Sequence, residues 1–186
     1  SDVFASDLSA YGLDTQTDDL TAAVVRASRE AAVGAALVFA SIGPTGAVLA
    51  AGELNPDDVR ASFEQQADAL AAAGPDGLVV ETMGDLEEAL LARAAAKRTG
   101  LPVVVSMVFD SGRAHDRTMT GVTPEAAAEA LTAGGADVLG MNCGVGLDNV
   151  AALCARLRSS TTLPVWVKPN AGLPVMVDGA ARYMTT

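Results

Sequence analysis

Cys143 carries the most reactive side chain in a promising position, because a thiolate is both a nucleophile and a metal ligand. It follows the largely apolar residues 138–142, and Gly144 and Gly146 leave room for the close approach of a ligand. The alternative is that Cys143 packs as a small hydrophobic residue, since free cysteine is among the most buried residue types. The position indicates a candidate thiol site and leaves packing open.

Glu81 is the second candidate, because its carboxylate directly follows the apolar residues 77–80. A carboxylate at the tip of a buried strand is suited to hold a substrate ammonium group or to act as a general base. The same position also suits a cap for a neighbouring helix or an ion pair with Arg113. The sequence does not choose among these roles.

The other reactive side chains point to packing or to solvent. Cys154 stands among alanine and leucine in a predicted helix, and the single histidine, His115, lies in a polar stretch typical of a loop. Residues 144–149 partly match the dinucleotide-binding fingerprint, but Asn149 replaces the third glycine and no acid follows about twenty residues on. The sequence contains no P-loop lysine motif, HExxH motif or nucleophile elbow.

The candidate residues lie within a regular alternation of short apolar runs and amphipathic segments. This alternation predicts βα units with a parallel sheet. Strands are expected at residues 35–40, 77–81, 102–108, 137–141 and 164–168, and helices at residues 18–32, 56–73, 85–98, 124–133 and 149–159. Asn55-Pro56 and Thr123-Pro124 predict helix starts. Glycines at positions 74, 100 and 134–135 predict helix ends.

Composition limits the class of protein. The 186 residues are 50% hydrophobic, which predicts one globular domain over residues 1–186. The net charge of −11 argues against a nucleic-acid partner, since such proteins need basic patches. No apolar run approaches the roughly eighteen residues of a membrane helix, so no membrane partner is expected. Two cysteines in aliphatic surroundings indicate reduced thiols and a cytoplasmic protein.

Two α/β architectures fit five parallel strands separated by helices. One is an open doubly wound sheet, and the other is the (β/α)8 TIM barrel, present here as a partial barrel of about five βα units, because a whole barrel needs about 250 residues. In both, ligands bind beyond the carboxyl ends of the strands, where Glu81 and Cys143 are expected. A slice of a barrel is further expected to leave two open edges and to expose its interior-facing side chains.

Several short segments at the predicted strand and helix ends occur in the same order in one known family. The chain resembles the homocysteine S-methyltransferases, zinc-dependent barrels that include betaine-homocysteine methyltransferase and the N-terminal module of cobalamin-dependent methionine synthase. The segments are Tyr11-Gly12-Leu13, Ser41-Ile42-Gly43-Pro44-Thr45-Gly46, Glu81-Thr82-Met83, Ser106-Met107-Val108-Phe109-Asp110, Thr120-Gly121, Gly140-Met141-Asn142-Cys143 and Pro169-Asn170-Ala171-Gly172-Leu173-Pro174.

The resemblance implies an enzyme whose small-molecule substrates are homocysteine and a methyl donor, and whose product is methionine. It implies that Cys143 is catalytic as one of three thiolate ligands of a zinc ion, with the homocysteine sulfur as the fourth ligand. A thiol bound to Zn²⁺ loses its proton near neutral pH. Glu81 matches the acid that holds the amino group of homocysteine. Asn142 and the loop Gly43-Pro44-Thr45 are expected to line the same pocket.

The family pattern is incomplete in this sequence. The adjacent cysteine pair that supplies the other two zinc ligands is absent, and so is the family's first strand with its Asp-Gly motif. We therefore expect the chain to be the central part of a barrel that is completed by further chain segments or by a homo-oligomer. By itself, the chain is expected to bind zinc poorly and to be inactive. The alternatives are a metal-free truncated relative acting as a binding or regulatory module, and an open-sheet nucleotide-binding enzyme.

Overall fold

The computed structural model describes residues 16–46, 48–52, 54–144, 147, 149–170, 172 and 174–183 of the chain. Its main feature is a five-stranded parallel sheet of β1 (Phe39–Ile42), β2 (Gly77–Met83), β3 (Val103–Met107), β4 (Val138–Cys143) and β5 (Val165–Pro169). The helices are α2 (Thr17–Ala32), η2 (Leu49–Ala51), α3 (Pro56–Ala72), α4 (Leu86–Arg98), α5 (Pro124–Gly134) and α6 (Val150–Ser159). A small antiparallel pair, β6 (Val175–Val177) and β7 (Ala180–Arg182), follows.

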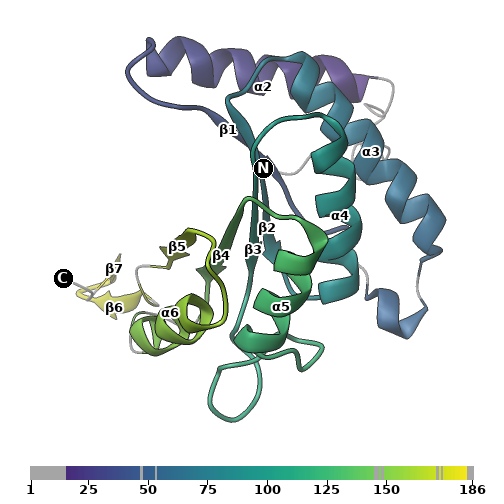
Figure 1. Ribbon diagram of the computed structural model, residues 1–186. Coiled ribbons are helices and arrows are strands. Elements are labelled where there is room, and N and C mark those ends of the chain that lie inside the picture. Colours follow the sequence, from purple (N-terminus) through teal and green to yellow (C-terminus); the bar gives the residue numbers. More distant parts are fainter. Residues whose placement is uncertain are drawn as a thin grey trace.

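The strands lie side by side in chain order, β1-β2-β3-β4-β5, without a reversal. A doubly wound sheet reverses its strand order at a switch point, so the open nucleotide-binding sheet is wrong for this chain. Figure 1 shows α3, α4 and α5 ranged along one side of β2 and β3. Singly wound βα units with helices outside are the construction of a (β/α)8 barrel, and the expected partial barrel is confirmed.

The sheet is curled, because side chains from strands that are not neighbours meet across it. The rings of Phe39 in β1 and Trp166 in β5 lie 6.0 Å apart between centroids. On β2, a Cβ atom at Gly77 would come within 2.4 Å of the Phe39 ring, so glycine leaves the space that this ring fills. We call the concave side the inner face and the helix-covered side the outer face.

The two faces follow the alternation of the strands. Leu78, Val80 and Val105 on the outer face are fully buried in one core cluster with helix residues. On the inner face, Val79 and Val104 are only 5% and 1% exposed. The expectation that the interior-facing side chains would be exposed is therefore wrong at these positions, because the curled sheet closes over its own middle.

The predicted helix starts are confirmed by their caps. The Oδ1 atom of Asn55 accepts a hydrogen bond from the backbone N–H of Asp57 at 2.9 Å, and the Oγ1 atom of Thr123 accepts one from Ala126 at 3.2 Å. At the helix ends, Gly135 adopts a φ of 87°, which glycine reaches without steric cost. Within the described part of the chain, no helix combines the length and the apolar character needed to cross a lipid bilayer.

The first strand differs from its prediction, which was residues 35–40, whereas β1 begins at Phe39 and extends to Ile42. Residues 35–37 are exposed, with Leu37 at 74%, although their composition is apolar. The carboxylate of Asp76 accepts a hydrogen bond from the Val38 N–H at 2.7 Å, and pairing with β2 begins only at the next residue. Apolar composition alone does not make a strand where a partner strand has not yet begun.

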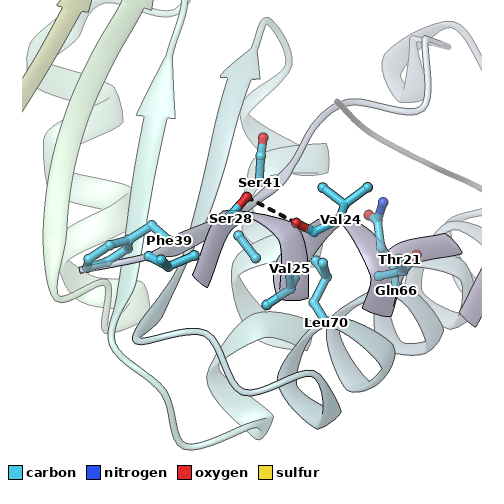
Figure 2. Close-up of a pocket in the computed structure, with 10 residues that line it drawn as sticks. Thr21, Val24, Val25, Ser28, Phe39, Ser41, Gln66 and Leu70 are labelled. Carbon is cyan, nitrogen blue, oxygen red and sulfur yellow. Dashed lines mark hydrogen bonds between the residues drawn. The ribbon is translucent and has the colours of Figure 1, made fainter. Parts of the chain in front are cut away.

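β1 and β5 are the two edges of the five-stranded sheet, as expected for a slice of a barrel. At the β1 edge, a pocket of about 190 Å³ opens between α2, α3 and β1 (Figure 2). Val24, Val25 and Leu70 line it together with residues of β1, and Val24 is half exposed. Within the described part of the chain, β1 ends the sheet on this side, next to these apolar side chains.

Candidate active site

Polar side chains from all five strands gather at one end of the inner face. We call this set the inner rim: Ser41, Glu81, Ser106, Asn142 and Lys168, one each from β1 to β5. Each lies at or near the carboxyl end of its strand, where parallel α/β folds place their ligand sites. Sequence reasoning singled out Glu81 and Asn142 and missed the other members as functional residues.

Asn142 ties three strand ends together. Its Oδ1 atom accepts hydrogen bonds from the backbone N–H of Thr82 at 2.9 Å and from Ser106 Oγ at 2.7 Å. Its Nδ2 atom donates to Thr82 Oγ1 at 2.8 Å and to Cys143 Sγ at 3.2 Å. These bonds use both donors and both lone pairs of the amide, so Asn142 is built to hold the strand ends and to orient the sulfur of Cys143.

Cys143 leaves the extended conformation at the end of β4. Its φ of 59° lies in the left-handed region, which is uncommon for a residue with a side chain and is often found at functional sites. The sulfur lies beside the Asn142 amide, while the half-buried side chain also lines a narrow crevice with Phe109, Leu153 and Pro169. Cys143 therefore both borders α6 and connects to the inner rim.

Glu81 is held on both sides of its carboxylate. Ser41 Oγ donates to Oε1 at 3.0 Å, and the Nζ atom of Lys168 pairs with Oε2. The Glu81 side chain is 15% exposed and that of Lys168 is 55% exposed. The ion-pair partner is Lys168 rather than Arg113. The signal for Lys168 was present in the sequence, because it ends an apolar run as Glu81 does.

The loop Gly43-Pro44-Thr45 is anchored to the helix layer. The backbone N–H and Oγ1 of Thr45 donate to Glu88 Oε1 on α4 at 2.7 and 2.6 Å. Burial raises the pKa of Glu88 above its ordinary value. Pro44 and Thr82 together line a pocket of about 250 Å³, and Thr82 is hydrogen-bonded to Asn142 of the inner rim. Its contact with a substrate stays a prediction.

The described residues alone do not fit a zinc ion. Among them, no group of three or more His, Cys, Asp or Glu side chains is arranged to hold a metal. Cys143 offers one sulfur, and this sulfur accepts a hydrogen bond from the amide of Asn142. Zinc sites in proteins use three or four protein ligands, so Cys143 needs partners beyond the described residues.

The remaining candidates behave as expected where the structure describes them. Cys154 packs against the hydrophobic core, and the exposed His115 places its Nδ1 atom 2.7 Å from the carbonyl oxygen of Asp110. The partial dinucleotide fingerprint lies in part outside the described residues, because positions 145, 146 and 148 are not among them. The segment Tyr11-Gly12-Leu13 also lies outside them.

The chain is similar to proteins of one known family. A family model described as homocysteine S-methyltransferase matches residues 3–186. The chain is 34% identical over 148 residues to the homocysteine S-methyltransferase of Escherichia coli (strain K12), a match that covers 75% of this chain and 46% of that protein. It is 30% identical over 152 residues to the methionine synthase of Mycobacterium leprae (strain TN), covering 78% and 12%.

A solved structure shares the fold. The metallated form of the homocysteine methyltransferase MmuM from Escherichia coli aligns with a TM-score of 0.77 and 27% identity over 91% of this chain and 64% of that one. The chain thus spans less than half of the two curated relatives and under two thirds of this structure. The family match, the partial barrel and the strand-end residues lead to one conclusion: the chain belongs to the homocysteine S-methyltransferase family.

Proposed function

We propose that the protein transfers a methyl group from a small-molecule donor to the thiol of homocysteine, forming methionine, and that the inner rim binds the homocysteine. One observation carries the proposal. Glu81 and Lys168 form an ion pair on the inner face, and Lys168 lies in register with Asn142, whose amide contacts the Cys143 sulfur. A charged pair and a thiol are thereby placed at the same strand ends in a member of this family.

Each residue has a separate role in the proposal. Glu81 binds the ammonium group of homocysteine, because its carboxylate is mostly buried on the inner face while its side chain stays 15% exposed. Cys143 binds zinc through its sulfur, and Asn142 positions that sulfur by donating a hydrogen bond to it. The loop Gly43-Pro44-Thr45 contacts the substrate in this proposal, and its Pro44 lines a pocket together with Thr82.

Zinc is supported by the family and by the metallated state of MmuM. A thiol coordinated to Zn²⁺ is deprotonated near neutral pH, which is the chemistry that the metal supplies. Because Cys143 alone does not complete a zinc site, the proposal includes further ligands and treats residues 1–186 as the central part of a barrel. The positions of β1 and β5 at the two ends of the described sheet support this, and the two free cysteines support a cytoplasmic location.

A second candidate function is a metal-free module that binds amino acids without methyl transfer. The observation that favours it is the lack of a metal-holding cluster among the described residues. The two candidates differ in one measurable property. Homocysteine affinity depends on zinc in the enzyme and is independent of zinc in the module.

Calorimetric titration of homocysteine into the zinc-loaded protein at its natural length tests the role of Glu81. We expect Glu81→Gln to lower the affinity by about tenfold or more, because the substrate ammonium loses a charged partner. Glu64→Gln is the matched control, since Glu64 pairs with Arg98 in the helix layer. Equal affinities for Glu81→Gln and the wild-type protein would contradict the proposal.

The same titration with and without zinc tests Cys143. Zinc should raise the homocysteine affinity of the wild-type protein and of Cys154→Ser, the control on α6. It should leave the affinity of Cys143→Ser unchanged, because the sulfur ligand is lost. An affinity that is independent of zinc in every variant would support the metal-free module instead.

A further inference from the structure

Lys168 is the single lysine or arginine within the five described strands of the sheet. We propose that Lys168 binds the carboxylate of the amino-acid substrate and that it competes with the substrate ammonium for Glu81. This inference rests on the proposed function, because it takes the inner rim as the homocysteine site. It makes Lys168 a specificity-determining residue for the whole zwitterionic head group.

The position of Lys168 is set by strand pairing. Its Cα lies in register with that of Asn142 on the neighbouring strand, and Cys143 pairs with Pro169 one step further. Neighbouring strands lie roughly 4.8 Å apart, so the backbone of Lys168 is close to the residue that orients the thiol. The side chain then reaches across the inner face from β5 to the Glu81 carboxylate on β2. A head group bound between the two charges lies near the Cys143 sulfur.

The ion pair is suited to exchange. Glu81 is mostly buried and additionally fixed by Ser41, whereas the Lys168 side chain is more than half exposed on a flexible four-carbon stem. The Lys168 ammonium is largely exposed to water, which replaces the carboxylate as its partner when Lys168 moves away. Glu81 is the fixed member of the pair and Lys168 is the movable one.

A zwitterionic ligand replaces the ion pair that Lys168 loses when it leaves Glu81, and a simple amine does not. When the ammonium of an α-amino acid binds Glu81, its carboxylate binds the released Lys168, and two ion pairs replace one. An amine that carries the same thiol but no carboxylate displaces Lys168 without giving it a partner. In a chain with a net charge of −11, a local cation is also what makes a carboxylate ligand acceptable.

The test compares two thiols that differ only in the carboxylate, homocysteine and 3-aminopropane-1-thiol, by calorimetric titration of the zinc-loaded protein at its natural length. We expect the wild-type protein to favour homocysteine by about tenfold or more. Lys168→Met should weaken homocysteine binding and strengthen binding of the amine, because Glu81 is freed from its internal partner. Lys168→Arg should keep the wild-type preference, and Lys97→Met, which removes a lysine paired with Asp137, is the matched control.

The opposite effects of Lys168→Met on homocysteine and on the amine separate this inference from a structural role of Lys168. A variant that weakens both ligands equally, or neither, would overturn the inference while leaving the proposed function intact if Glu81→Gln still lowers homocysteine affinity. Should Lys168→Met fail to fold, the wild-type comparison remains decisive. Equal wild-type affinities for the amino acid and the amine would overturn the inference without any variant.

Discussion

The outer and inner faces of the same five strands do different work. On the outer face, aliphatic side chains such as Leu78 and Leu139 are at most 1% exposed and pack against helices. On the inner face, the strands are apolar in the middle and polar at their carboxyl ends, where Glu81 and Asn142 lie. The difference teaches that strand alternation lets one face supply stability while the other supplies binding groups.

The largest expected effect breaks the outer face. Leu139→Ala should lower the free energy of unfolding by about 2–5 kcal/mol, because it removes a buried side chain and leaves a cavity. The homocysteine affinity of the folded protein should stay unchanged. Urea unfolding followed by circular dichroism measures the first quantity and calorimetry the second. A loss of stability below about 1 kcal/mol, or a matching loss of homocysteine affinity, would contradict the separation of stability and binding between the two faces.

A smaller loss of stability with a larger loss of function is expected on the inner face. Asn142→Ala leaves the fully buried hydroxyl of Ser106 without its acceptor, which costs about 1–3 kcal/mol. Methyl transfer should fall by about tenfold or more, because Cys143 loses the group that orients its sulfur.

The control for that variant is Asn55→Ala, which removes the cap of α3 and costs about 1 kcal/mol. It should lower stability by a similar amount and leave the rate of methyl transfer unchanged. If both variants reduce the rate equally, the loss at Asn142 reflects general destabilisation rather than positioning of the thiol.

Sequence patterns predicted most of the outer face, because its features are local. The caps at Asn55 and Thr123 depend on residues two or three positions away, and apolar runs located four of the five strands closely. The first strand was misplaced, because residues 35–37 are apolar but have no neighbouring strand to pair with. Where a strand begins depends on its partner as well as on its own composition.

The candidate site was harder to predict, because its contacts join distant segments. Glu81 and Lys168 are 87 positions apart, and only the curl of the sheet brings them together. The positive φ of Cys143 also has no signature in the sequence, so the contact between its sulfur and Asn142 could not be inferred. Residue types at strand ends indicated where the site lies, and the pairing within it required the fold.

The smallest expected effect concerns Glu88, a carboxyl buried in the helix layer. Burial raises its pKa, so the folded protein holds the Glu88 proton more tightly than the unfolded chain does. The resulting stabilisation is complete below the ordinary value of 4.5 and is lost as the pH rises through the raised pKa. Glu88→Gln cannot ionise and still accepts the Thr45 bonds, so it should unfold at a higher temperature than the wild-type protein in alkaline solution.

The melting temperatures of the wild-type protein and of Glu88→Gln should converge in acid, where both side chains are neutral. Thermal unfolding across a pH series measures the difference directly. Melting temperatures that differ by the same amount at every pH would mean that the ionisation of Glu88 does not affect stability, and that its bonds to the Thr45 loop dominate.

The most direct test of the shared site is the alkylation rate of Cys143 in metal-free protein, followed by mass spectrometry, with Cys154 as the internal reference. Both cysteines are free and partly buried, but Cys143 alone contacts the Asn142 amide. We expect methionine to slow alkylation of Cys143 and not of Cys154, and we expect Glu81→Gln to remove that protection. Equal rates at Cys143 with and without methionine would contradict a site in which Glu81 and Cys143 bind the same amino acid.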